Sequence, residues 1–448
     1  MKNVLYVATD RLYAGRMRLY GGWERYPFLE RIAKRGGFIP EAVSAAASTV
    51  MCHASEWTGL YPHQHHDFGQ VPNEQRRYEL GIGSADGTVF TDMLDKGYDC
   101  HVVMVTKPGK YHETYKQVHQ LWEHRGVKVH LVPDWDQPGG EGKTRLDHLR
   151  VATAAIAASN QAGRRAFVWL KIHGFFKHKT LKGEVLDLLA VNHREVEGTP
   201  VLHRDHAWNL QVDRSLKSLV ETGELDLAST ELFFASDHGS FQGQYGLRGY
   251  GYHLRQEIVH VPVICSMPLT ACDGPVSMRT VRSMISGRDM TKERYVFSET
   301  MYPGQVPDGN NPKHDHMKTM IRKGPWKLIW SPGRKLISNT SNVELYDLRI
   351  DPHEKHNLAD RDDQFIDRMR GVSCGRRDWF MRYPEGPLDP GGELDGMEWR
   401  LQSGKSKPLQ ENSYALAGWD QVDDIEAELL EQVRQLYKRT GREAWMPR

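Results

Sequence analysis

The chain of 448 residues is longer than a single hydrophobic core usually supports, which predicts one large domain and a smaller one. Its 59 Lys and Arg residues nearly balance its 58 Asp and Glu residues, which argues against a dedicated nucleic-acid or membrane-surface binder. No apolar run approaches the roughly 18 residues needed to cross a bilayer, and the five scattered cysteines form neither a disulfide framework nor a zinc motif.

The first 290 residues alternate predicted strands and helices, as in α/β proteins. The chain opens on an apolar strand over residues 3–9 rather than on a signal-peptide segment, so we expect a cytoplasmic location. Helices are predicted just before Gly36, just before Gly97, and over residues 145–162 and 206–222. Further strands are predicted after Gly97 and over residues 165–173, 230–237 and 260–267.

Polar residues fall at or just past the ends of these predicted strands. They are Asp10, Lys107, His173 and Asp237. The alternation predicts a mainly parallel central sheet with helices on both faces, and such sheets carry their chemistry at the carboxyl ends of the strands. We therefore expect a functional site at that edge.

The pattern changes after residue 290. Antiparallel strands with tight turns are predicted within residues 317–333 and 335–352, and a short helix over residues 362–370. Residues 384–398 have the composition of an irregular loop, and an amphipathic helix over residues 423–440 ends the pattern. The sequence thus predicts a catalytic domain over residues 1–290 and a smaller α+β subdomain over residues 291–448.

The stretch from Ala47 to His65 combines small residues, hydroxyls and a thiol. Small residues lead into Thr49, and Gly59 and Pro62 interrupt the chain soon afterwards. On its own this stretch is typical of a loop and one short helix, with Thr49 as an ordinary cap.

A second interpretation follows when Thr49 is combined with Asp10 and the pair Asp237-His238. Two carboxylates, an imidazole and a hydroxyl are ligands suited to Zn²⁺, Mn²⁺, Mg²⁺ or Ca²⁺. A metal in contact with the Thr49 oxygen would lower the pKa of the hydroxyl and make it a nucleophile. The competing interpretation of Asp-His-Gly is an ordinary turn.

Four segments together resemble the alkaline-phosphatase superfamily, in particular its sulfatase-like branch. They are NVLYVATD, ERIAKRGGFIPEAVSAAAST…TGLYPHQHH, LFFASDHGSFQGQYGLRGYG…EIVHVPVI and MIRKGPWKLIW…ELYDLRIDPHEKHNLAD. The last segment is the most specific match, and the resemblance covers nearly the whole chain. It implies an alkaline-phosphatase-like fold with the central sheet and the C-terminal subdomain predicted above.

The resemblance also implies a register for the nucleophile. Sulfatases place a cysteine, converted to formylglycine, nine positions before the Thr of a T-G pair, and counting back from Thr58 gives Thr49. Cys52 partly mimics the sulfatase motif C-x-P-S-R, but Glu56 replaces its arginine and Cys52 lies three residues too close to Thr58. We therefore predict that Cys52 is a buried small residue. His53 falls where the family has its arginine, in position to contact the nucleophile or a substrate oxygen.

By the same resemblance, Asp10, Thr49, Asp237 and His238 form a metal site like that of phosphonate monoester hydrolases. One divalent ion is expected (Mn, Zn, Ca or Mg). A second ion would draw on His203, Asp205 and His206, although Asp205 is equally an N-cap for the helix that follows.

The sequence departs from the family pattern at two positions. Arg11 replaces a second aspartate and is either a cation for a phosphoryl or sulfuryl oxygen or a solvated side chain. Tyr250 stands where relatives carry Lys or His. Lys110, in a G-K-Y-H sequence, and Lys107 compete for the role of oxyanion-binding lysine. His178, with His173 as the alternative, is the predicted general acid for the leaving group.

The resemblance implies a metal-dependent hydrolase of phosphate esters, whether phosphodiester, phosphonate or phosphate monoester, with a threonine nucleophile. Three alternatives stay open: a sulfatase, a phosphotransferase, and a catalytically inactive metal-binding homologue. The expected substrate is a small-molecule or glycan ester, with no nucleic acid or membrane span involved. Homo-oligomerisation is left open.

Overall fold

The computed structural model describes most of the predicted elements. The described residues are 2–22, 24–65, 87–106, 119–120, 122–133, 144–172, 203–242, 244, 247–269, 274–287, 293–300, 318–331, 342–361 and 419–439. Among the helices of this part of the chain, none combines the length and apolarity that a membrane span requires.

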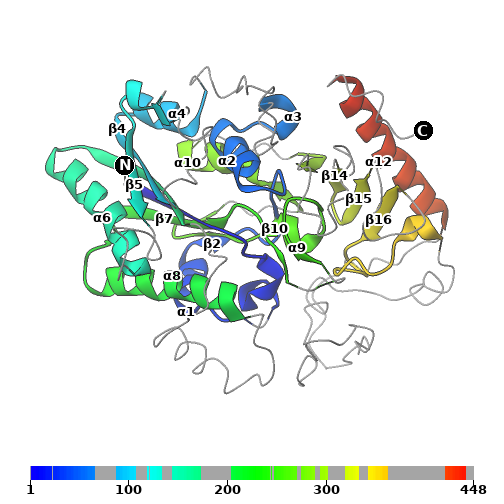
Figure 1. Ribbon diagram of the computed structural model, residues 1–448, viewed down its shortest axis with the longest axis horizontal. Coiled ribbons are helices and arrows are strands. Elements are labelled where there is room, and N and C mark those ends of the chain that lie inside the picture. The colour runs from blue at the N-terminus through cyan, green and yellow to red at the C-terminus, as the bar shows by residue number, and fades with distance from the viewer. Residues whose placement is uncertain are drawn as a thin grey trace.

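A seven-stranded sheet forms the centre of the molecule, in the order β2-β11-β7-β1-β6-β4-β5 (Figure 1). Five of its strands are parallel, and β11 and β2 add an antiparallel edge. Their bounds are β1 Asn3–Thr9, β2 Gly37–Phe38, β4 Tyr98–Thr106, β5 Lys128–Pro133, β6 Arg165–Ile172, β7 Thr230–Ser236 and β11 Val263–Cys265. The predicted α/β class and the mainly parallel sheet are confirmed.

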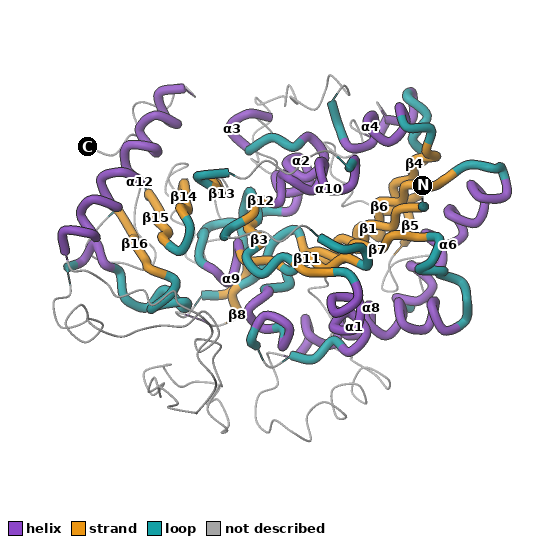
Figure 2. The backbone as a smooth tube through the Cα atoms, turned by 180° about the vertical axis from the view of Figure 1, so that it is seen from behind, coloured by secondary structure: helices purple, strands orange, loops and turns teal. Residues whose placement is uncertain are grey.

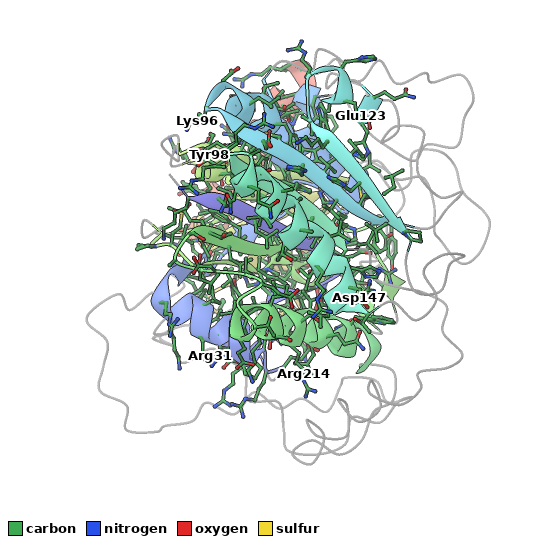
Figure 3. The ribbon with its side chains drawn as sticks, turned by 90° about the vertical axis from the view of Figure 1, so that its left-hand side faces the viewer. Arg31, Lys96, Tyr98, Glu123, Asp147 and Arg214 are labelled. Carbon is green, nitrogen blue, oxygen red and sulfur yellow. The ribbon has the colours of Figure 1, made fainter. Side chains whose placement is uncertain are left out.

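Helices cover both faces of this sheet (Figure 2). On one face lie α1 (Pro27–Arg35), α6 (Arg145–Gln161) and α8 (His203–Glu221); on the other lie α2 (Thr49–Thr58), α4 (Val89–Asp95) and α10 (Val281–Ser286). The alternation of β1 shows why two cores form. Leu5 and Val7 face the first group of helices, whereas Val4 and Tyr6 face the second. In Figure 3, Arg31 of α1 and Arg214 of α8 lie on the side of these helices that faces away from the sheet.

A second, antiparallel sheet follows in the order β13-β14-β15-β16. Its strands are β13 Val296–Thr300, β14 Lys318–Lys323, β15 Trp326–Trp330 and β16 Val343–Asp347, and α12 (Trp419–Arg439) packs on it. The antiparallel strands predicted here are confirmed. The division of the chain at residue 290 stays a prediction.

Short elements join these layers. They are η1 Ala14–Arg16, η2 Arg18–Tyr20, β3 Ala42–Val43, α3 Pro62–His65, β8 Phe241–Gln242, β9 Arg248–Gly249, α9 Gln256–Val259, β10 His260–Val261, β12 Val276–Ser277, η5 Met278–Thr280 and η6 Leu358–Asp360.

Three boundaries differ from the sequence expectation. The single strand predicted over residues 260–267 is wrong: Pro262, which has no N–H to donate, separates β10 from β11, and the two belong to different sheets. α8 begins at His203 and α12 at Trp419, each a few residues before the predicted start. The predicted helix over 362–370 and the loop over 384–398 lie outside the described residues.

Candidate active site

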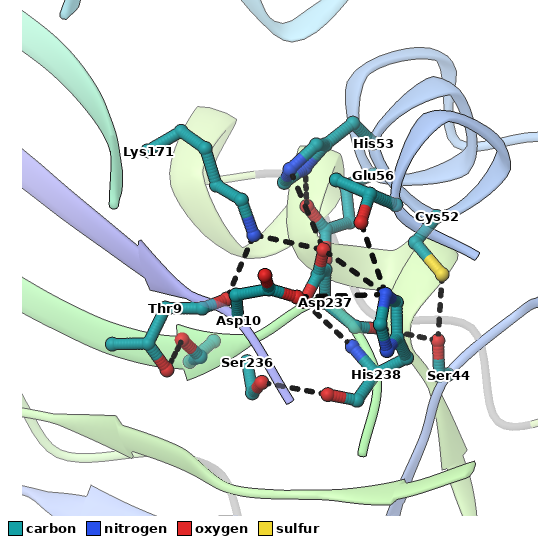
Figure 4. A network of polar contacts seen from close by, with 12 residues as sticks. Thr9, Asp10, Ser44, Cys52, His53, Glu56, Lys171, Ser236, Asp237 and His238 are labelled. Carbon is teal, nitrogen blue, oxygen red and sulfur yellow. Dashed lines mark hydrogen bonds and ion pairs between the residues drawn. The ribbon is translucent and has the colours of Figure 1, made fainter. Parts of the chain in front are cut away.

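The ends of β1 and β7 bring two predicted residues together. The strands are parallel neighbours with Thr9 opposite Ser236, so Asp10 and Asp237 emerge side by side at the same edge of the sheet (Figure 4). The backbone N–H of Leu12 donates to Ser236 Oγ at 3.0 Å, and Ser236 Oγ donates to the carbonyl of His238 at 2.9 Å. These bonds fix the two strand ends against each other.

Asp10, Asp237 and His238 form a compact buried group. Each offers a ligand atom, and these atoms all lie within 4.8 Å of one another. His238 Nε2 lies 3.6 Å from Asp10 Oδ1 and 3.6 Å from Asp237 Oδ2. The predicted convergence of the early and the late carboxylate is therefore present.

Hydrogen bonding sets the tautomer of His238. Its Nδ1 lies 2.8 Å from the carbonyl oxygen of Gly239, which can only accept, so Nδ1 carries the proton. Nε2 then faces the two carboxylates and the Thr49 hydroxyl. A metal-binding histidine is oriented in the same way, through a bond from its other nitrogen to a carbonyl.

Thr49 is the first residue of α2, and its hydroxyl completes the group. Thr49 Oγ1 lies 3.0 Å from His238 Nε2, and the side chain is 7% exposed. Every residue of α2 is buried, which explains why the sequence shows no amphipathic period in this segment. As the first helical residue, Thr49 lies at the positive end of the helix dipole, which favours negative charge on its oxygen.

The sequence reasoning missed Lys171, which lies on β6. Its ammonium is fully buried and donates to Asp237 Oδ2 at 2.8 Å and to the carbonyl of Thr9 at 2.9 Å (Figure 4). The backbone N–H of His238 donates to the other oxygen, Asp237 Oδ1, at 2.9 Å. The Asp237 carboxylate is thus held at both oxygens. The available signal was a single lysine within the otherwise apolar run of β6.

His53 lies beside this group, one helical turn after Thr49. Its Nδ1 is 2.9 Å from Glu56 Oε2, and its Nε2 is 3.9 Å from Asp237 Oδ2. Burial, together with the Asp237 charge, raises the pKa of Glu56 well above its usual range. The predicted contact of His53 with the nucleophile or a substrate oxygen stays a prediction.

Cys52 lies behind the group. Its Sγ is 3.2 Å from Ser44 Oγ and 3.3 Å from the carbonyl of Ala46, and only 1% of the residue is exposed. Burial, reinforced by the charge of Asp237, raises the pKa of the thiol well above its usual value. The predicted burial of Cys52 is confirmed, and its surroundings disfavour a reactive thiolate.

Arg11 and Tyr250, the two departures from the family pattern, contact each other. Arg11 Cζ lies 4.6 Å from the centroid of the Tyr250 ring, and that ring stacks on His238 with centroids 4.2 Å apart. Arg11 is 9% exposed, so it is not a solvated surface arginine.

Other predicted site residues stay predictions. Lys107, Lys110, His173 and His178 lie outside the described residues, as do the side chains of His203, Asp205 and His206 within α8. The donors that are described fit a divalent cation. Two carboxylates, an inward-facing imidazole nitrogen and a hydroxyl within a few ångströms make a set that Zn²⁺, Mn²⁺, Mg²⁺ or Ca²⁺ accepts.

Comparison with solved structures confirms the predicted fold. BT1596, a 2-O GAG sulfatase, is 16% identical, covers 81% of this chain and 88% of its own, and gives a TM-score of 0.53. The phosphonate monoester hydrolase of Agrobacterium radiobacter is 14% identical, with coverages of 82% and 93% and a TM-score of 0.52. The fold is therefore alkaline-phosphatase-like, and it is shared with this sulfatase and this phosphonate monoester hydrolase.

A sequence comparison gives a shorter match. The "uncharacterized sulfatase YidJ" of Escherichia coli (strain K12) is 29% identical over 185 residues, which make up 39% of this chain. The match spans about a third of that relative's length, 35%. No protein-family model matches the chain.

Proposed function

We propose, from the premise that the chain has the fold of sulfatases and of a phosphonate monoester hydrolase, that it is a metal-dependent hydrolase of phosphate esters. The observation that carries this proposal is the position of Thr49 Oγ1, 3.0 Å from His238 Nε2 and beside the Asp10 and Asp237 carboxylates. A bound divalent cation would supply Lewis acidity, which lowers the pKa of the hydroxyl and offsets charge on the substrate oxygens.

The residues of the chain would then act as follows. Asp10, Asp237 and His238 hold the cation, and Lys171 keeps the Asp237 carboxylate in place. Thr49 gives its proton to water, and its Oγ1 forms a bond to phosphorus as the bond from phosphorus to the leaving-group oxygen breaks. The leaving oxygen takes a proton from a general acid, for which His178 is our candidate. Water then cleaves the threonyl phosphoester, or an acceptor alcohol does so in a phosphotransferase.

Threonine favours phosphate over sulfate esters. Formylglycine releases sulfate by elimination from a hemiacetal, a route that threonine lacks. Cys52, from which formylglycine would have to be made, is buried and hydrogen-bonded to Ser44. A sulfatase is nonetheless the second candidate, because YidJ and BT1596 both carry that name.

We propose further that residues 1–290 form the catalytic domain and residues 291–448 a smaller subdomain. The hydrophobic cluster between the second sheet and α12 supports the latter. For the substrate we propose a small-molecule or glycan ester, since BT1596 is described as a GAG sulfatase.

The test is turnover of an aryl phosphate monoester, an aryl phosphodiester, an aryl phosphonate and an aryl sulfate, each with Mn²⁺ or Zn²⁺. We expect phosphoester turnover that Thr49→Ala lowers by about 10³-fold or more and that Cys52→Ala leaves intact. The reverse result would move the nucleophile to Cys52 and favour the sulfatase. Metal binding without turnover of any ester would favour the inactive homologue.

A further inference from the structure

Arg11 has an unusual backbone conformation. Its φ is 64°, a left-handed value that only two other non-glycine residues adopt in the described part of the chain. Side chains other than glycine adopt this region at a cost, and such residues persist where their surroundings hold them. Arg11 directly follows the metal-ligand candidate Asp10, so the strained turn lies at the site itself.

Contacts to the second strand end hold this turn. Leu12 N–H donates to Ser236 Oγ, which donates in turn to the His238 carbonyl. The residue after Arg11 is thereby fixed to the segment that carries Asp237 and His238. The bonds that join the two strand ends therefore lie directly next to the left-handed turn at Arg11.

The backbone of the Gly-rich loop also has special conformations on both sides of Tyr250. Gly249 and Gly251 flank it with φ values of 89° and 94°, which only glycine adopts readily. The hydroxyl of Thr300 donates to the Gly251 carbonyl and ties the loop to β13. Two special backbone conformations, one on each segment, thus bring Arg11 and Tyr250 into contact.

The contact has a geometry suited to anion binding. An arginine that packs over an aromatic ring keeps its planar fork of N–H donors, and this fork matches two oxygens of a tetrahedral anion. Lys171, also a cation at the site, is fully buried and donates hydrogen bonds to Asp237 and to the Thr9 carbonyl. The Arg11 guanidinium lies over the Tyr250 ring, which in turn stacks on His238, so it lies at the same edge of the site.

We propose that Arg11 binds the non-bridging oxygens of a tetrahedral oxyanion group on the substrate, and that Tyr250 is the positioning residue for Arg11. The inference rests on the proposed function, because it adds a specificity-determining residue to the same site. Relative to the family pattern, an arginine in place of an aspartate exchanges an anionic metal ligand for a cation. An arginine at this position attracts an anionic group, whereas an aspartate would add a ligand to the metal.

Calorimetric titration of the Mn²⁺-loaded protein with inorganic phosphate, and in parallel with sulfate, tests the proposal without requiring turnover. We expect Arg11→Gln to weaken binding of the preferred anion by about tenfold or more, and Arg11→Lys by less. Tyr250→Phe, which keeps the ring, should change the affinity by less than about twofold, whereas Tyr250→Leu should weaken it by about fivefold.

Two controls separate anion binding from a structural effect. Mn²⁺ affinity should fall by no more than about threefold in any of the four variants, because none removes a proposed metal ligand. Arg31→Gln is the matched control, since Arg31 is an exposed arginine over the ring of Phe28 on α1, with Cζ 5.8 Å from the ring centroid. It should bind both anions as wild type does.

The outcomes distinguish this inference from the proposed function. If no ester is hydrolysed but Arg11→Gln still loses anion affinity, the proposed function fails and the inference stands. If esters are hydrolysed and Arg11→Gln keeps wild-type KM and anion affinity, the inference alone is wrong. Equal losses of Mn²⁺ and anion affinity in Arg11→Gln would also overturn it, since they would assign Arg11 a structural role.

Discussion

Two groups of buried charges lie at different places in this molecule and can be compared directly. The strand-end cluster lies where β1 and β7 end and consists of Asp10, Thr49, Lys171, Asp237 and His238. The junction network lies between α9 and the second sheet and consists of Arg255, Glu257, Lys327, Glu344 and Glu354. Both contain more than one carboxylate away from water.

The junction network neutralises its carboxylates with side chains and with a proton. Arg255 lies 3.0 Å from Glu344 Oε2, and Lys327 Nζ lies 2.5 Å from Glu354 Oε1. Burial, together with the charge of Glu354, raises the pKa of Glu257 to about 7. Below about pH 7 the Glu257 carboxyl therefore holds a proton, whereas Glu344 and Glu354 are each paired with a cation.

The strand-end cluster is built differently. Lys171 neutralises Asp237, and in addition the ligand atoms of Asp10, Asp237 and His238 converge to within 4.8 Å of one another. Groups that repel one another at such a separation are stabilised by a cation placed among them. Buried charged groups that are each paired with an opposite charge or neutralised by a proton indicate a structural role. Buried carboxylates whose ligand atoms converge on one point indicate a site for a bound cation.

Loss of a partner in the junction network should have the largest effect on stability. Glu344→Ala leaves Arg255 buried without its carboxylate, which typically lowers the free energy of unfolding by about 3–5 kcal/mol. Urea unfolding followed by circular dichroism measures it. As a control, Glu224→Gln removes an exposed pair with Arg150 and should leave the stability unchanged. Equal effects of the two substitutions would contradict a structural role for the network.

Glu257 should make stability depend on pH. Its folded-state pKa of about 7 exceeds its usual 4.5, so the folded protein binds the extra proton between these values and stability falls as pH rises through that window. The expected loss, about 3 kcal/mol, is complete above about pH 7. Glu257→Gln should remove the part of this dependence that Glu257 contributes and be more stable than wild type at about pH 8. An unchanged pH profile of urea unfolding would show that Glu257 does not hold the proton.

The parts of the fold that the sequence predicts are those with a local signal. β1 and β7 are apolar runs that stop at Asp10 and Asp237, and a parallel sheet requires such ends to meet. The role of Thr49 could not be predicted from hydrophobic periodicity, because α2 is buried on all sides and its sequence shows no amphipathic period. Its register came from the spacing to Thr58 in a family resemblance.

The parts that the sequence did not predict depend on contacts between distant segments. Lys171 meets Asp237 across 66 positions, and although its place in an apolar strand was a signal of burial, nothing near it in the chain identifies its partner. The contact between Arg11 and Tyr250 arises from two unusual backbone turns that composition does not reveal. Pro262 was a visible signal for the break between β10 and β11. The apolar residues on both sides of it led instead to the prediction of one continuous strand.

Mn²⁺ should stabilise the folded protein through the strand-end cluster. At about a hundred times its dissociation constant, the ion raises the free energy of unfolding by about 2.7 kcal/mol. Asp237→Asn should lose most of this increase, because it removes one of the convergent carboxylates. The matched control is Asp213→Asn, at a buried aspartate that accepts from the backbone N–H groups of Phe28 and Leu29. It should keep the Mn²⁺ effect in thermal unfolding; a loss in both variants would argue against the metal site.

Lys171→Met tests whether lysine and metal compete for one carboxylate. Without the ammonium, Asp237 and Asp10 remain buried with less compensation, so the metal-free protein should be less stable and Mn²⁺ should bind about tenfold more tightly. Lys327→Met, at a buried lysine paired with Glu354 in the junction network, should lower stability without changing Mn²⁺ affinity. Calorimetric titration with Mn²⁺ separates the two variants. Weaker Mn²⁺ binding in Lys171→Met would contradict this competition. It would mean that the lysine acts mainly by orienting the Asp237 carboxylate for the metal, and that this effect is larger than the repulsion between the ammonium and the ion.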